Sequence, residues 1–320
     1  MPSKGKGCYV YVIDTGCDSV EAGKFIANDR ITYIPNLDST KDETHEKHGT
    51  SVAVLVGGIE KPESAAKFGS GTPPVFKGKT GTVAPDPGSE AFRAAPASNC
   101  NLVILRYNSS AKSSASNPVV EDLVNNALDQ GKEKDQMDKL AGLIKSIRDA
   151  GIIVVAAAGN HRGNVDNMIY KAPSVRTEGE KKDYNVMDIP FARLWVPPCF
   201  EGVITVGALD QKGGKWVDSA SVKFWLLGDN VVNPLKPAVP LQGTSFAAPM
   251  LSGIIACILT SSAHKSQLMS LQGAARQAAV EKVLCDLGKP FKVANYNGSG
   301  FYNGWGFFQK SINVGAVMTK

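Results

Sequence analysis

Several features that would define other classes of protein are scarce in this 320-residue sequence. No apolar run approaches the roughly 18 residues needed to span a bilayer. Six cysteines are too few for a disulfide scaffold at this length, and no Cys-x-x-Cys pair or Cys/His cluster indicates zinc. The net charge is +5, but the lysines are scattered and no stretch of Arg and aromatic residues accompanies them. We therefore expect neither a membrane nor a nucleic acid as a partner.

The composition is that of a globular protein, with 43% hydrophobic and 20% charged residues. Apolar β-branched runs alternate with helical patterns, which favours an α/β fold with a parallel sheet. No linker divides the chain, so we expect one domain over residues 1–320. The predicted strands are 8–13, 31–34, 102–107, 152–158 and 203–206, and the predicted helices are 48–59, 119–130, 137–150, 244–259 and 266–287. Loops are expected over 60–100 and 161–198, and an irregular tail from 289.

Two polar residues lie at the ends of predicted elements, in positions where α/β proteins bind ligands. Asp14 ends the first strand, in Val12-Ile13-Asp14-Thr15-Gly16, and ligands bind beyond the carboxyl ends of parallel strands. His48 opens an apolar helix, where the positive end of the helix dipole favours the neutral imidazole that a general base needs. Each also has a plain structural reading, as a turn aspartate and a surface histidine.

A hydroxyl and an amide occupy similar positions later in the chain. Ser245 lies in Gly243-Thr244-Ser245-Phe246-Ala247-Ala248-Pro249, at the start of a helix whose unpaired N–H groups would stabilise an oxyanion. Asn160 follows the strand that ends in Ala156-Ala157-Ala158-Gly159, and its amide can donate to a developing negative charge. The structural readings are a helix cap and a turn asparagine. Together the four residues fit the nucleophile, base and orienting group of acyl transfer.

These four segments, in the order Asp, His, Asn, Ser, resemble the signatures of subtilisin-like serine proteases. Lesser matches are Ala95-Pro96 ahead of the strand at 102 and Val203-Ile204-Thr205-Val206-Gly207-Ala208. The motif-bearing region is 7–262, followed by a C-terminal helix and a tail over 263–320. The resemblance implies a three-layer α/β/α sandwich with a mostly parallel central sheet.

The resemblance also implies a serine endopeptidase. Ser245 would attack the scissile carbonyl, His48 would carry the proton, and Asp14 would orient the imidazole. Asn160 and the Ser245 backbone N–H would bind the oxyanion. The residues before Asn160, Ala157, Ala158 and Gly159, would contact the substrate. No metal or cofactor is expected in the chemistry, and structural calcium is left open because no ligand motif is visible.

One family segment is absent from the sequence. Relatives carry a strand ending in Ser-Leu-Gly that lines the substrate cleft, whereas only a Ser-rich loop and helical patterns lie between Tyr107 and Ile152. The alternative is therefore a catalytically silent relative that binds peptides or protein partners. Two other enzyme classes fit poorly. An aspartic protease needs a second Asp-Thr-Gly loop, and an α/β-hydrolase needs glycine where Ala247 stands.

The expected partner is a polypeptide substrate, and a propeptide or proteinaceous inhibitor remains open. We expect a monomer. The family favours secretion, with which two glycosylation sequons at Asn108 and Asn297 agree, and a cytoplasmic location is the alternative. Cys17 lies three residues after Asp14. As a free thiol near the triad it would make the protein sensitive to mercurials, and as a buried small residue or half-cystine it would not.

Overall fold

The helices and strands place the four candidate residues at the ends of elements. The computed structural model describes residues 4–34, 39–44, 47–58, 76–77, 83–84, 95–106, 130–160, 173–175, 197–211, 214–220, 222, 224–236, 238–287, 289–290 and 310–311. None of the helices in these ranges is long and apolar enough to cross a membrane.

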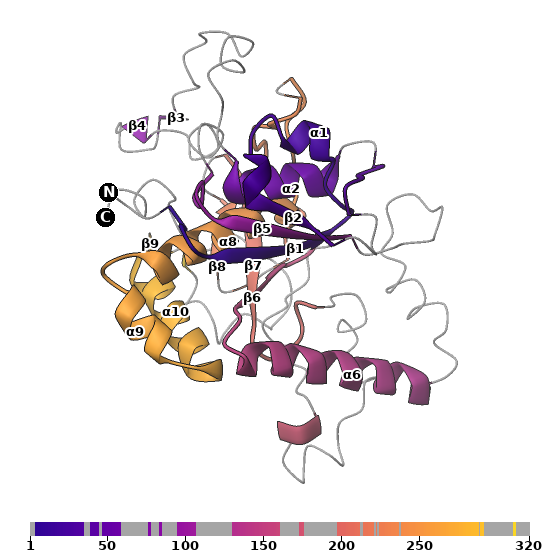
Figure 1. The fold of residues 1–320 in the computed structure, drawn as a ribbon, viewed down its shortest axis with the longest axis vertical. Helices are drawn as coiled ribbons and strands as arrows, with labels where there is room; N and C mark the ends of the chain where they lie inside the picture. The colour runs from indigo at the N-terminus through magenta and orange to yellow at the C-terminus, as the bar shows by residue number, and fades with distance from the viewer. Residues whose placement is uncertain are drawn as a thin grey trace.

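A three-stranded parallel sheet, in the order β1-β5-β2, carries the N-terminal half of the site (Figure 1). Its strands are β1 (Tyr9–Asp14), β2 (Ile31–Tyr33) and β5 (Asn101–Arg106). The register pairs Asp14 with Arg106, so both strands end at the same edge. Helix α2 (His48–Gly57) packs on β1 and β5, while the short α1 (Ser19–Ala22) and the 3-10 turn η1 (Asn28–Arg30) connect β1 to β2.

A second sheet, in the order β6-β7-β8-β10-β9, carries the other half. Strands β6 (Val154–Ala157), β7 (Val203–Leu209) and β8 (Phe224–Leu227) are parallel. At its far side, β10 (Lys310–Ser311) is parallel to β8 and β9 (Lys289–Pro290) is antiparallel to β10. A half-exposed strand alternates between buried and exposed residues. Strand β7 does not, because its last six residues are all buried.

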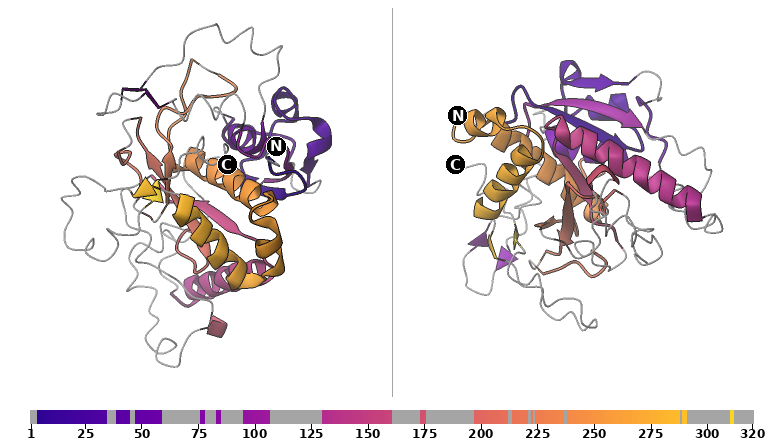
Figure 2. Two further views of the ribbon diagram at one scale, coloured as in Figure 1. Left: turned by 90° about the vertical axis from the view of Figure 1, so that its left-hand side faces the viewer. Right: turned by 90° about the horizontal axis from the view of Figure 1, so that it is seen from below.

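Helix α8 (Thr244–Thr260) joins the two halves of the molecule (Figure 2). It packs against β6, β7 and β8 of the second sheet and also against α2 and β1. Its side chains accordingly enter two hydrophobic clusters: Phe246 and Ala256 pack with the first sheet, and Met250 and Ile254 pack with the second. Helices α9 (Lys265–Ser270) and α10 (Gly273–Leu287) follow, and α6 (Gln130–Asp149) contacts α10 and β6.

Parallel sheets flanked by helices confirm the predicted α/β class. Among the described strands, β1 pairs with β5 and β6 pairs with β7, and no described strand joins the two sheets. The helix predicted over 266–287 is two helices. Leu271 is extended between them, and the Arg276 guanidinium donates to the carbonyl oxygens of Leu268 and Leu271, which stabilises the break.

Other differences concern weak local signals. Helix α6 begins at Gln130 and runs through 131–136, where the prediction had a gap, because the charged residues there are good helix formers. Strand β8, with the sequence Phe-Trp-Leu-Leu, was not predicted, since a four-residue apolar run has no periodicity to identify it. Two short strands, β3 (Phe76–Lys77) and β4 (Val83–Ala84), pair inside the predicted loop. The predictions for 119–129 and most of 60–94, 161–198 and the tail lie outside the described residues.

Candidate active site

Asp14 and His48 meet at the edge of the first sheet. The Nδ1 atom of His48 lies 2.7 Å from Oδ1 of Asp14, and the same oxygen accepts the Thr15 N–H at 2.7 Å. Both side chains remain partly exposed, with 29% and 18% of the His48 and Asp14 side chains accessible. The two ring nitrogens of an imidazole have distinct roles, and here Nδ1 is the one that contacts the carboxylate.

A glycine makes this approach of α2 to β1 sterically feasible. A Cβ atom on Gly49 would stand 2.1 Å from the Gly16 carbonyl oxygen and 3.1 Å from Oδ1 of Asp14. Neither position can be vacated by a side-chain rotation, because one is backbone and the other belongs to the Asp14–His48 pair. Any larger residue at position 49 would therefore push the first turn of α2 away from Asp14.

A buried carboxylate that the sequence analysis did not single out lies behind this pair. Asp42 is 1% exposed and accepts hydrogen bonds from the hydroxyl groups of three threonines: Thr15, Thr44 and Thr50. Only its position six residues before His48, in a stretch of charged and threonine residues, could have drawn attention to it. Its hydrogen bonds connect the end of β1, the loop at 39–44 and the start of α2.

Ser245 occupies the first turn of α8. The residue after it, Phe246, packs its ring against that of His48 with centroids 5.2 Å apart and an interplanar angle of 48°. Ser245 is partly exposed, whereas Thr244 and Phe246 are buried. The start of α8 therefore anchors on His48 through Phe246 and presents the adjacent serine to solvent.

The Asn160 amide is fixed by the same turn. Its Oδ1 accepts the Thr244 backbone N–H and the Thr244 hydroxyl, each at 3.0 Å. Because a backbone N–H can only donate, Oδ1 must face Thr244, and Nδ2 is turned the other way. Nδ2 lies 3.1 Å from where a Cβ on Gly243 would stand, and Gly243 has a φ of +135°. Glycine at 243 thus leaves room for the Asn160 amide group.

The residues predicted to contact substrate lie next to Asn160, with much of their backbone already engaged. The Ala158 N–H donates to the Val206 carbonyl, and the Gly159 N–H donates to the Thr244 hydroxyl. The Gly159 carbonyl accepts from Ala220. These bonds fix the segment Ala157, Ala158 and Gly159 against β7 and α8, and its role in substrate binding stays a prediction.

Cys17 is a free thiol with no exposed surface, near the Asp14–His48 pair. Burial raises its pKa to about 12, with the carboxylates of Asp42, Asp18 and Asp14 adding to the effect and a hydrogen bond from the Tyr33 hydroxyl opposing it. The structure therefore favours the buried-residue interpretation of Cys17 over the half-cystine one. Mercurial sensitivity stays a prediction.

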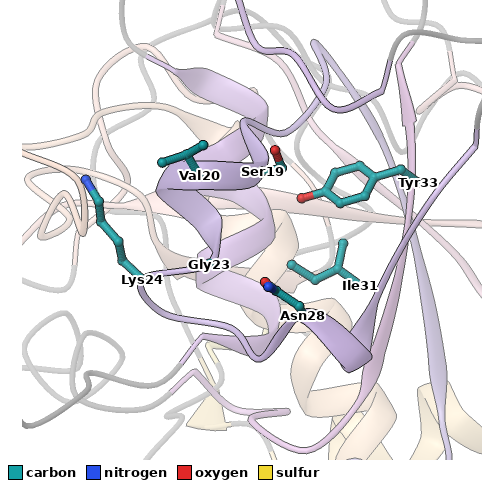
Figure 3. A pocket seen from close by; sticks show the side chains of 7 residues that line it. All are labelled: Ser19, Val20, Gly23, Lys24, Asn28, Ile31 and Tyr33. Atoms are coloured by element: carbon teal, nitrogen blue, oxygen red, sulfur yellow. The ribbon is translucent and has the colours of Figure 1, made fainter.

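An open hollow of about 630 Å³ lies elsewhere, between α1 and β2 (Figure 3). Ser19 and Val20 line it from α1, Lys24 lines it from the turn that follows α1, and Ile31 and Tyr33 line it from β2. None of the four candidate residues lines this hollow. We therefore place the candidate site at the meeting point of β1, α2, β6 and α8. No group of three or more His, Cys, Asp and Glu side chains in the described ranges is arranged to hold a metal ion.

Comparisons with known proteins identify the family of this chain. The model of the subtilase family matches residues 5–306. Mycosin-1 of Mycobacterium tuberculosis (strain ATCC 25618 / H37Rv) is 26% identical over 294 residues, which cover 79% of this chain. The chain spans only 59% of the length of Mycosin-1.

Solved structures show the same fold. The MycP3 protease from the type VII (ESX-3) secretion system aligns with a TM-score of 0.52 at 20% identity, covering 99% of this chain and 84% of that one. A cold-adapted subtilisin-like serine proteinase aligns with a TM-score of 0.52 at 18% identity, covering 97% and 90%. At these identities the structural likeness concerns the fold alone, and the chemistry must be argued from the site.

Proposed function

This chain belongs to the subtilase family, and from that premise we propose that it is a serine endopeptidase acting through Ser245, His48 and Asp14. The contact that carries the proposal is the 2.7 Å approach of His48 to Asp14, with the Ser245 turn packed on the same imidazole through Phe246. In this proposal, three segments far apart in the sequence supply the carboxylate, the imidazole and the hydroxyl of one site.

In the proposed reaction, the Ser245 hydroxyl oxygen attacks the carbonyl carbon of a peptide bond while His48 accepts the hydroxyl proton. Asp14 holds the imidazole with Nδ1 protonated and stabilises the imidazolium. The tetrahedral intermediate collapses to an acyl-enzyme when His48 returns the proton to the leaving amine. Water then repeats the sequence and releases the acid.

Two donors serve the oxyanion in this proposal. One is the Ser245 backbone N–H, which belongs to the first turn of α8 and has no partner within the helix. The other is Nδ2 of Asn160, whose direction follows from the bonds of Oδ1 to Thr244. Donors held in advance of the reaction stabilise the developing charge without reorganisation. No step uses a metal or cofactor, and structural calcium stays an untested expectation.

The proposed substrate is a polypeptide and the proposed state is monomeric. Secretion is supported indirectly, since MycP3 is described as a protease of a secretion system.

A fluorophosphonate probe tests the proposal. The probe should phosphonylate the wild-type protein at Ser245 with loss of fluoride, and Ser245→Ala should abolish labelling. Ser252→Ala is the matched control, because Ser252 lies two turns further along α8 and its hydroxyl donates to the Ala248 carbonyl oxygen. It should be labelled like the wild type. The wild-type protein should also cleave an unfolded polypeptide, as measured by mass spectrometry, and Ser245→Ala should abolish this cleavage.

A second candidate, the catalytically silent binder, rests on the missing Ser-Leu-Gly segment between Tyr107 and Ile152. Among the described strands, none pairs with β1 on the side away from β5, or with β6 on the side away from β7. A substrate cleft lacking one wall could bind a peptide without cutting it. Folded wild-type protein that takes no label and cleaves no polypeptide would favour this candidate over the peptidase.

A further inference from the structure

The first turn of α2 is capped in an unusual way. The first N–H groups of a helix have no partner within it and are commonly satisfied by the side chain of the residue at the N-cap. Here that residue is Lys47, in a left-handed conformation with φ 51° and no capping side-chain bond. Its ammonium group donates instead to the Asp18 carboxylate and the Asp42 carbonyl.

Three other side chains satisfy the start of the helix. The His48 N–H donates to the Thr44 hydroxyl at 3.0 Å, and the Gly49 N–H donates to the Thr15 hydroxyl at 3.0 Å. The Thr50 N–H donates directly to Oδ2 of Asp42 at 2.9 Å. The cap is thus distributed over residues from two separate parts of the sequence, around position 15 and at 42–44.

Asp42 organises all three of these bonds. The Thr44 and Thr15 hydroxyls donate to its Oδ1 at 2.6 and 3.1 Å, and the Thr50 hydroxyl donates to its Oδ2 at 2.8 Å. A threonine hydroxyl has a single proton, so donation to Asp42 turns its lone pairs toward the helix N–H groups. The carboxylate therefore acts on the helix both directly and through two hydroxyl relays.

We propose that Asp42 is a positioning residue for the Asp14–His48 pair, an inference that rests on the function proposed above. Through Thr15, Asp42 holds the residue whose N–H binds the Asp14 carboxylate. Through Thr44 and Thr50 it holds the helix turn that begins with His48. One buried group thus fixes both partners of a 2.7 Å contact, and its loss lets them move independently.

The test is Asp42→Asn, with Glu43→Gln as the matched control. The asparagine keeps the shape of the side chain but replaces one carboxylate oxygen with an NH₂ group. The N–H and O–H groups that donate to that oxygen in the wild type then face another donor. Glu43 is the adjacent carboxylate, 69% exposed and paired with Arg106. Active sites are titrated with the fluorophosphonate, so that kcat is expressed per competent molecule. We expect Asp42→Asn to lower kcat by about 10- to 100-fold with KM unchanged, since misplacement of about 1 Å can cost that much.

A second pair keeps the test independent of folding. Thr44→Ser retains the relay hydroxyl, whereas Thr44→Val removes it at nearly constant shape. We expect the serine variant to keep the wild-type kcat and the valine variant to lose roughly 10-fold. Equal kcat in the two Thr44 variants, or wild-type kcat per titrated site in Asp42→Asn, would overturn the positioning role.

Amide hydrogen exchange separates this inference from the proposed function. Exchange at residues 48–50 should be faster in Asp42→Asn than in Glu43→Gln, whatever the catalytic outcome. Wild-type protein without activity would refute the peptidase, and the exchange data would still decide whether Asp42 holds the start of α2. Unchanged exchange in Asp42→Asn would contradict the inference even in an active enzyme.

Discussion

Helices α2 and α8 both begin at the candidate site, but their first turns are fixed in different ways. The start of α2 depends on hydrogen bonds to Thr15, Asp42 and Thr44, which the chain brings together from two other segments. The start of α8 depends on one amide, Asn160, and on a contiguous motif that then enters the apolar core. The base is therefore positioned by a dispersed polar network, and the nucleophile by local sequence and packing.

The largest expected effect comes from breaking the α2 side at its contact with Asp14. In Asp14→Asn the amide nitrogen faces Nδ1 of His48, so the imidazole must carry its proton on Nε2 and cannot accept one from Ser245. We expect kcat to fall about 10⁴-fold, as in the corresponding change in a serine protease of another fold. The measurement is single-turnover acylation of a peptide ester.

Folding of that variant is checked by thermal unfolding. The Thr15 N–H and Nδ1 of His48 meet the same Asp14 oxygen, so an amide nitrogen that faces His48 leaves the Thr15 N–H without its acceptor. We therefore expect the variant to stay folded but to lose about 1 kcal/mol of stability. Wild-type acylation by Asp14→Asn would show that the 2.7 Å contact has no catalytic role.

The next largest effect separates the two jobs of Asn160 on the α8 side. Asn160→Asp keeps an oxygen for Thr244 but replaces the donor Nδ2 with an anion. We expect kcat to fall by about 10²–10³-fold, the loss seen when subtilisin loses its oxyanion asparagine. Unfolding in urea should stay near wild type.

Asn160→Ala is the companion variant, because it removes both donor and acceptor. We expect the same loss of kcat together with about 1–2 kcal/mol of stability, since the Thr244 N–H and hydroxyl lose their acceptor. If Asn160→Asp acylates as fast as wild type, the amide does not serve the oxyanion, and its bond to Thr244 is its whole function.

The difference between the two helices also explains what the sequence could predict. Ser245 was identifiable because its neighbours from Gly243 to Pro249 form one continuous motif, and Asn160 because it ends a strongly apolar strand. Asp42 was not, since its role arises from bonds to residues 27 positions before it and 8 after it. Periodicity likewise predicted the longer elements but not β8 or the break at Leu271, which depend on tertiary contacts.

A smaller effect tests how closely α2 approaches β1. Gly49→Ala places a Cβ atom 2.1 Å from the Gly16 carbonyl oxygen, and overpacking of this kind costs about 1–3 kcal/mol. Gly142→Ala is the matched control, because a Cβ there meets nothing within 4 Å. Alanine is favoured over glycine in a helix, so this control should gain about 0.5–1 kcal/mol.

Urea unfolding of the two glycine variants measures both effects. A loss of unfolding free energy in Gly49→Ala and a gain in Gly142→Ala would show that the start of α2 is closely packed. The same result would show that α6 has free space at position 142. A stable Gly49→Ala protein with wild-type kcat would mean that α2 can shift without disturbing the Asp14–His48 contact. That result would make the dispersed network less important than the comparison of the two helices suggests.

The smallest effect concerns access of solvent to the α2 side, for which Cys17 is a built-in probe. Burial raises its pKa to about 12, so only about 10⁻⁴ of the thiol is ionised at pH 8, and alkylation requires the thiolate. Iodoacetamide at pH 8 should therefore modify Cys285, which is partly exposed on α10, well before Cys17.

Raising the pH should speed Cys17 modification only as the pH approaches 12, unless the protein unfolds first. An unfolded chain ionises this thiol near its ordinary pKa of about 8.5, so alkaline pH favours unfolding between those two values. Peptide mass spectrometry resolves the two sites, and equal rates at pH 8 would show that the network around Asp42 opens often enough to admit reagent.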